Sequence, residues 1–447
     1  MVFDLKLKTV AKASIALAFF SFIADVVALF RDRILTSHFG ASRMLDVYYS
    51  AFKLPDLVFN LLVLGAVSSA FIPVFIGEYK NNEANAWRLA QNFTTIIFLM
   101  VLTSAGVLWF FAGSVVSLIA PGFSGTDREV AISLTRLMLL SPVLFSLSTI
   151  FGSVLQSLER FWAYAIAPVL YNFGIIIGAV YFVPLMRIHG YPEVLGLGWG
   201  VVFGALLHFC IQGTAAMIAG FRWRPVFDLA DQNFRKILKL MVPRTLGLGA
   251  YSIDSAVVNA IASTMAIGSI SVLNVANNLQ FVPIAVVGVS VATAVFPRLS
   301  MHASGQELKE FKEKLYAAMK STALIVVPLS VVGYFLSHWA INLIFGIGSY
   351  RGTSVDLTAA VLAIFMFGIP AQSLIPILSR AFYALQNTAI PVSVSVVSIL
   401  VNWLGAWLFA IHYHWGVAGL AAAFSIAGNL NFFLLWIFFR RFTKHHF

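Results

Sequence analysis

The sequence has 447 residues, 60% of them hydrophobic and 11% charged, with a formal net charge of +11. Soluble domains typically contain about 25% charged residues, so this composition excludes an ordinary soluble protein. The basic residues lie in short loops between long apolar runs, a distribution that indicates membrane topology and not nucleic-acid binding. The single cysteine, Cys210, excludes an intrachain disulfide and a thiolate cluster.

Apolar runs long enough to cross a hydrocarbon core of about 30 Å recur along the whole chain. The runs are unbroken and do not alternate, so the sequence predicts helices and not a barrel. We therefore predict an all-α polytopic membrane protein. Its twelve transmembrane helices are expected at residues 10–36, 45–79, 85–113, 129–152, 160–184, 195–219, 234–263, 269–297, 312–337, 355–383, 390–412 and 415–439.

The lysines and arginines predict the orientation of these helices. If the N-terminus lies in the cytoplasm, most of them fall in inner loops, as the positive-inside rule requires. With an even number of spans, both termini are then expected on the cytoplasmic side. The first span follows Lys6, Lys8 and Lys12, but Asp25 interrupts it, which favours a membrane helix over a cleaved secretory signal.

The chain contains an internal repeat. Leu45-Asp46-Val47 followed by Pro55 matches Leu273-Asn274-Val275 followed by Pro283, 228 residues later. Six helices per repeat give both halves the same orientation, related by an axis along the membrane normal. The sequence therefore predicts two six-helix lobes, residues 1–220 and 221–447, that can rock about a central site.

Charged residues interrupt the first predicted helix. Asp25 and Asp32 are seven residues apart and share a face, with Arg31 close to it. A charge at the centre of a membrane helix costs about 2.5–3.5 kcal/mol, so a role in a polar cavity is favoured. The alternative is that Arg31 and Asp32 only reach toward water at the outer end of the helix.

The second predicted helix carries Asp46, Lys53 and Asp56 on one face. Pro55 beside them predicts a kinked or opened helix that lines water, although Lys53 could simply neutralise Asp56. The matching region of the second half has uncharged amides instead, at Asn274, Asn277, Asn278 and Gln280. We expect the two regions to face each other across one polar cavity, suited to a ligand rich in hydroxyl, amide and phosphate groups.

A second polar group lies on the seventh and eleventh helices, at Asp254, Asn259 and Asn402. Carboxylate and amide oxygens suit a hard cation such as Na⁺, and hydrogen bonds between packed helices are the alternative. No other metal site is expected, because His208 and Cys210 are two residues apart and face different ways. The eighteen acidic residues are scattered, so we expect no enzyme and no catalytic residues.

Several long segments resemble the MurJ (MviN) lipid II flippases of the MOP exporter superfamily. They are FRDRILTSHFG from Phe30, LDVYYSAFKLPDL from Leu45, VANNLQFVPIAVVGVSVATAVFPRLS from Val275 and SRAFYALQNTAIPV from Ser379. The resemblance implies a V-shaped, MATE-like bundle of two lobes in the bacterial cytoplasmic membrane. It further implies that the protein moves the undecaprenyl-pyrophosphate-linked peptidoglycan precursor from the inner to the outer leaflet by alternating access.

The family pattern carries over only in part. Arg31, Asp32, Asp46, Lys53 and Pro55 match it, whereas Asp25, Asn278 and Asn259 stand where the family places Arg, Arg and Asp. We therefore predict Arg31 as the principal phosphate partner and Lys53 as the second. The predicted substrate-binding set is completed by Asp25, Asn277, Asn278 and Gln280, and the predicted gate and cavity set is Asp32, Asp46, Asp56 and Pro55.

The loss of cationic positions leaves other functions open. The chain could export a different polyprenyl-linked glycan or an amphiphile, or act as a non-transporting scaffold for cell-wall assembly. Family members typically add two helices that line a groove for the lipid tail, and twelve are expected here. We expect no cofactor, coupling to Na⁺ or to the membrane potential, a monomer, and contacts with membrane lipids and cell-wall synthesis proteins.

Overall fold

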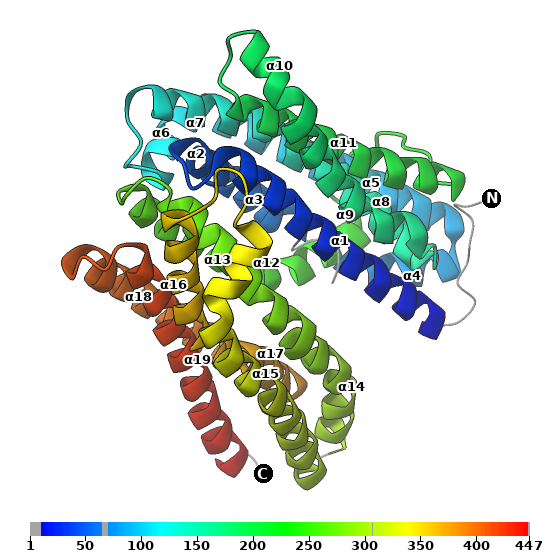
Figure 1. The fold of residues 1–447 in the computed structure, drawn as a ribbon. Coiled ribbons are helices and arrows are strands. Elements are labelled where there is room, and N and C mark those ends of the chain that lie inside the picture. The colour runs from blue at the N-terminus through cyan, green and yellow to red at the C-terminus, as the bar shows by residue number, and fades with distance from the viewer. Residues whose placement is uncertain (1–9, 65–69, 306, 446–447) are drawn as a thin grey trace. The chain divides into compact units, whose positions relative to one another are not determined.

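The computed structural model describes residues 10–64, 70–305 and 307–445, and this part of the chain consists of helices joined by short loops (Figure 1). It forms two compact units. Unit 1 comprises Met1–Leu35 and Arg43–Ala256, and unit 2 comprises Thr36–Ser42 and Val257–Phe447. The division falls inside one long helix at Ala256, whereas the sequence placed it in the loop after Gly220.

Within its described residues, unit 1 is built from α1 to α11, the larger part of α12 and the π-helical turns η2 and η4. They are α1 (Val10–Phe39, whose last residues belong to unit 2), α2 (Arg43–Ala51), α3 (Lys53–Phe59), η2 (Asn60–Leu64), α4 (Ile72–Asn81), α5 (Glu83–Phe110), α6 (Ala112–Ile119), α7 (Gly125–Met138), α8 (Leu140–Ser157), α9 (Phe161–Ile177), η4 (Gly178–Phe182), α10 (Val183–Ile188), α11 (Val194–Ile218) and α12 (Gln232–Ser263).

Unit 2 contains the end of α12 and the remaining helices. These are α13 (Ser269–Pro283), η5 (Ile284–Val289), α14 (Ser290–Ser304), α15 (Leu308–Phe345), α16 (Thr353–Met366), α17 (Ile369–Ala384), α18 (Ala389–Gly405), η6 (Ala406–His412) and α19 (Val417–His445).

These elements confirm the predicted all-α class and coincide with the twelve expected helices, several of which are broken into shorter pieces. Within the described residues, nine helical stretches are long and apolar enough to span a membrane. A tenth results if α16 and α17, bent by 46° at their junction, count as one span. Residues 65–69 of the expected second helix lie outside the described part of the chain.

The predicted repeat is visible in the backbone. The π-helical turns η4 and η6 begin 228 residues apart, at Gly178 and Ala406, which is the offset of the sequence repeat, whereas η5 follows Pro283 directly and η2 begins five residues after Pro55. The helix ends match as well: Glu159 and Gln386 adopt left-handed φ angles of 60° and 57°. In each case the next amide donates to a carbonyl five residues earlier, at 2.8 Å from Arg160 and 2.9 Å from Asn387. Both halves thus end this helix with the same Schellman-type turn.

Glycines bring α9 and α11 of unit 1 into very close contact (Figure 1). A Cβ atom on Gly200 would lie 2.7 Å from the Cα of Gly178, and one on Gly204 would lie 2.4 Å from the carbonyl oxygen of Tyr171. Membrane helices pack through such small residues, because lipid gives no hydrophobic driving force for association. This contact fixes the position of Tyr171, which lines the cavity described next.

Candidate functional site

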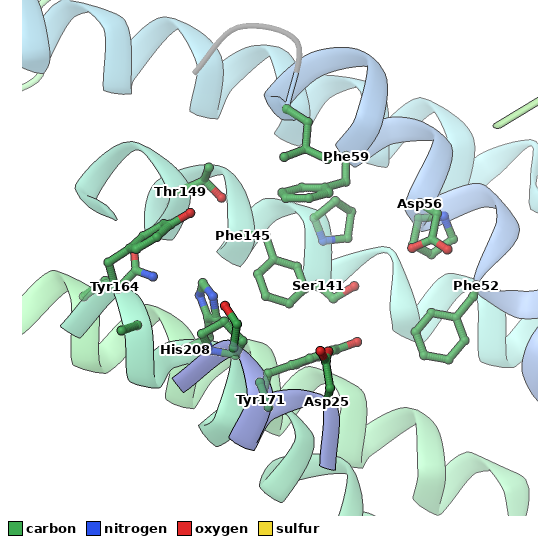
Figure 2. Close-up of a pocket in the computed structure, with 18 of the residues that line it drawn as sticks. Asp25, Phe52, Asp56, Phe59, Ser141, Phe145, Thr149, Tyr164, Tyr171 and His208 are labelled. Atoms are coloured by element: carbon green, nitrogen blue, oxygen red, sulfur yellow. The ribbon is translucent and has the colours of Figure 1, made fainter. Parts of the chain in front are cut away.

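Unit 1 contains an open cavity of about 510 Å³, shown in Figure 2. Its walls come from α1, the segment from Phe52 to η2, α8, α9 and α11, and thus include both helices in which the sequence predicted functional charges. The residues that line it are Leu17, Ser21, Ala24, Asp25, Phe52, Pro55, Asp56, Phe59, Leu64, Ser141, Pro142, Phe145, Thr149, Tyr164, Ala165, Pro168, Tyr171, His208 and Gln212.

The helix around Pro55 is broken on the wall of this cavity. α2 ends at Ala51, α3 begins at Lys53, and η2 follows directly after Phe59. Proline has no backbone N–H and its ring conflicts with the preceding turn, so a break near Pro55 follows from the sequence. A π turn widens the helix locally and is frequent at functional sites. The second helix is therefore irregular at this point, and Pro55 and Asp56 line the cavity.

Arg31 is held by partners inside unit 1. Its Nε and Nη2 atoms donate to Oδ1 of Asp32 at 2.9 and 2.7 Å, and Nη1 donates to Oδ1 of Asn172 at 2.7 Å. The Asp32 side chain is 4% exposed. A buried carboxylate needs a cation and hydrogen bonds to offset its desolvation, and Arg31 supplies both. The pair therefore ties α1 to α9, and neither residue lines the cavity.

Lys53 and Asn60 connect the second span to α12. Nζ of Lys53 donates to Oγ of Ser255 at 2.9 Å, and Nδ2 of Asn60 donates to Oγ of Ser252 at 3.1 Å. Lys53 forms no ion pair with Asp56 within 4.0 Å in the described structure. The interpretation that Lys53 merely neutralises Asp56 is thus not supported by a direct contact.

The other predicted residues of unit 1 lie in different surroundings. Asp25 and Asp56 are both exposed to the cavity, on α1 and α3 respectively. Figure 2 shows their carboxylates on separate walls. Asp46 is fully buried in α2, away from the residues that line the cavity. Of the charged residues that the sequence grouped together, the cavity therefore contains only the two aspartates at positions 25 and 56.

The amides predicted in the second half lie on α13 of unit 2. Nε2 of Gln280 donates to Oδ1 of Asn277 at 2.8 Å, and Nδ2 of Asn274 donates to the carbonyl oxygen of Ile270 at 2.8 Å. These bonds stay within one helix. Asn278 lies on the same helix, is partly buried and has a partner of its own.

The candidate ion site is divided between the two units. Asp254 belongs to unit 1, whereas Asn259 and Asn402 belong to unit 2, and all three side chains are buried. Because the three residues are divided between the two units, their role as a sodium site stays a prediction. Across the described residues, no group of three or more His, Cys, Asp or Glu side chains is arranged to hold a metal ion.

Sequence reasoning did not find most of the cavity wall. Tyr164, Tyr171 and Phe145 contribute aromatic rings, and His208 and Gln212 contribute polar groups from α11. Oγ of Ser148 lies 2.7 Å from Nδ1 and 3.0 Å from the carbonyl oxygen of His208. These are single neutral residues in strongly apolar helices, so neither charge nor periodicity distinguishes them from lipid-facing neighbours. The proline at position 168 was the only local signal.

The model of the family described as lipid II flippase MurJ matches residues 35–447 of this chain. The chain belongs to the MurJ family. A probable lipid II flippase MurJ from Buchnera aphidicola subsp. Acyrthosiphon pisum is 31% identical over 435 residues, which cover 95% of this chain and 82% of that protein. The lipid II flippase MurJ of Burkholderia cenocepacia is 28% identical over 443 residues, covering 96% and 84% of the two chains.

Solved structures agree with this membership at the level of the fold. A lipid II flippase MurJ in an inward closed conformation superposes with a TM-score of 0.80 at 24% identity, covering 95% of this chain and 87% of that one. An inward-facing multidrug resistance MATE transporter of the MOP superfamily gives a TM-score of 0.75 at 14% identity, with coverage of 95% and 96%. The MurJ membership and the apolar helices together make this chain a multi-pass inner-membrane protein.

Proposed function

We propose that this chain is a lipid II flippase, which moves the undecaprenyl-pyrophosphate-linked peptidoglycan precursor from the inner to the outer leaflet by alternating access of its two units. The observation that carries the proposal is the MurJ match, which extends from residue 35 to residue 447 and includes both repeats. The two-unit helical architecture supports it, because such repeats can expose a site to either side in turn.

The test is transport of lipid II by the purified chain. Liposomes containing the full-length protein should expose lipid II at the opposite leaflet faster than protein-free liposomes, and the gene should rescue cells depleted of their own flippase. Correctly inserted protein that does neither would overturn the proposal. Reporter fusions should also place both termini in the cytoplasm.

We further propose that Lys53 binds the phosphate groups of the substrate more readily than Arg31 does. Its ammonium has three donors, and one of them is committed, to Ser255. Arg31 already uses three of its five donors on Asp32 and Asn172, so binding a phosphate there requires breaking a buried ion pair. Lys53→Met should therefore reduce lipid II transport at least tenfold while the protein still inserts. Lys53→Arg, which keeps the charge, is the matched control and should retain part of the transport.

The driving force is proposed to be a Na⁺ gradient or the membrane potential, with Asp254, Asn259 and Asn402 as ion-site candidates. Oxygen ligands of this kind suit a hard cation. Transport measured with each gradient imposed separately decides between the two, and Asp254→Asn should weaken coupling only in the Na⁺ case. Transport at the same rate with and without each gradient would exclude both driving forces.

A second candidate is export of a different polyprenyl-linked glycan or amphiphile in the same fold. The observation favouring it is the acidic cavity of unit 1, which has Asp25 where the family resemblance expects arginine. Binding of lipid II compared with other lipid-linked saccharides separates the two candidates. We propose no catalytic activity.

A further inference from the structure

We propose that the cavity of unit 1 is a binding site for an organic cation, namely a protonated amine carried on an apolar or aromatic body. The site would exist whether or not the chain transports lipid II. The proposal rests on four properties of the cavity: its charge, its unpaired acceptors, its aromatic rings and its size.

The cavity wall carries negative charge without a cation. Asp25 and Asp56 both line it, and no lysine or arginine is among the described residues of the wall. Within the described structure neither carboxylate takes part in an ion pair. Arg31 is paired with Asp32, and Lys53, three residues before Asp56 on α3, places its positive charge near Asp56 but donates to Ser255 and does not line the cavity. Both side chains are exposed to the cavity, so a cation bound there could reach two carboxylates that have no ion-pair partner among the described residues.

The wall also holds acceptors that lack donors. Gln212 is 1% exposed and its Oε1 accepts no hydrogen bond from any described residue. Both contacts of the Ser148 hydroxyl are satisfied if it donates to the carbonyl of His208 and accepts from Nδ1–H of that ring. Nε2 of His208 is then an acceptor. An ammonium group brings N–H donors, which is what this set of groups lacks.

Aromatic rings surround the remaining space. The ring centroid of Phe145 lies 5.5 Å from that of Phe59, 5.1 Å from that of Tyr171 and 5.1 Å from that of His208. Figure 2 shows these side chains together with Tyr164 and Phe52 around one cavity. The faces of such rings attract cations by about 0.5–2 kcal/mol each, and they also receive an apolar body.

The size of the cavity favours an organic ligand over an ion or a proton. Its volume of about 510 Å³ lies within the usual range of about 300–1,000 Å³ for small-molecule sites. A bare metal ion would need several clustered ligands, and the described residues contain no such cluster. Protons could neutralise Asp25 and Asp56, yet they would leave Oε1 of Gln212 without a donor among the described residues.

The test uses a matched pair of ligands that differ only in charge. Binding of 1-naphthylmethylamine and of 1-naphthylmethanol to the full-length chain in phosphatidylcholine nanodiscs is measured by calorimetry, with empty nanodiscs subtracted. We expect the amine to bind at least about tenfold more tightly than the alcohol, because only the amine can be protonated. Equal binding of the two, or no binding of the amine, would overturn the proposal without recourse to any variant.

Variants then locate the site. Asp25→Asn combined with Asp56→Asn should weaken amine binding at least tenfold and leave the weak binding of the alcohol unchanged. The matched control is Asp356→Asn, since this carboxylate lies on α16 of unit 2, is 63% exposed and pairs with His338. Asp25→Glu should retain binding. Amine binding that survives in the double variant, or falls equally in the control, would refute the assignment.

Transport measurements keep this proposal separate from the proposed function. Amine binding that depends on Asp25 and Asp56 in a protein without lipid II transport would support the cation site and overturn the flippase. Lipid II transport without amine binding would do the reverse.

Discussion

The second span of unit 1 and its counterpart in unit 2 share a backbone and differ in chemistry. Each is preceded by a glycine with positive φ, 66° at Gly40 and 89° at Gly268, and each continues into a π-helical turn. Between these landmarks unit 1 carries Arg43, Asp46, Lys53 and Asp56, whereas the stretch in unit 2 has no charged residue and carries amides and serines. The repeat therefore preserves the path of the chain, and the charged groups are a property of unit 1 alone.

The largest expected effect comes from removing Arg31, the cation that pairs with the buried Asp32 carboxylate. Arg31→Ala breaks this ion pair, which costs about 3–5 kcal/mol of stability. Thermal unfolding followed by size-exclusion chromatography should show a large fall, accompanied by reduced expression. Arg31→Ala combined with Asp32→Asn should recover most of the stability. A variant that is stable but inactive would instead assign Arg31 to the substrate.

A smaller effect, equal in the two units, is expected from filling close helix contacts. A Cβ on Gly200 would meet Gly178 at 2.7 Å, and one on Gly419 would meet the backbone nitrogen of Ala410 at 2.6 Å. Because backbone cannot move aside cheaply, Gly200→Ala and Gly419→Ala should each cost about 1–3 kcal/mol. The same thermal assay measures both.

Gly77→Ala is the control for these two variants. Nothing lies within 4 Å of a Cβ at this position in α4, so alanine should be neutral or stabilising by up to about 1 kcal/mol. A loss of stability in only one of the two close-contact variants would show that the units do not share this packing.

The smallest effect is expected at the matched turns. Glu159→Gly and Gln386→Gly each relieve a left-handed conformation that costs a non-glycine residue about 1–2 kcal/mol, but glycine also gains freedom in the unfolded chain. We expect both variants to raise stability by less than about 1 kcal/mol and by similar amounts. Opposite signs in the two units would contradict the common turn.

Much of the fold could be predicted from the sequence, because span length and loop charge act locally. Twelve helical stretches and the repeat follow from hydropathy and from matched prolines. The broken helix at Pro55 follows from the chemistry of one residue. The unit boundary at Ala256 could not be predicted, since α12 continues through it without a turn or a change in composition.

The site was less predictable, because partners far apart in the sequence decide it. In the sequence, Arg31 resembles a ligand-binding cation. In the structure it donates a hydrogen bond to Asn172, which is 141 residues away in the chain. Gln212 and Tyr171 are neutral residues in apolar helices, and only the packing of α9 on α11 turns them toward a cavity. Charged residues in the sequence identified two of the helices that line the cavity. Tertiary contacts determine which side chains of these helices face it.

The π turns bear on the ancestry of the two halves. A π turn accommodates one additional residue in a helix, whereas in a regular α-helix a single inserted residue would rotate everything beyond it by about 100°. Two independent insertions at the matching places of η4 and η6 are a more complicated history than inheritance from one gene. The simplest account is that an ancestral six-helix chain already contained this irregularity before it was duplicated and fused. The aspartates and the lysine of unit 1 are then a later specialisation, or a loss in unit 2, superimposed on an older backbone.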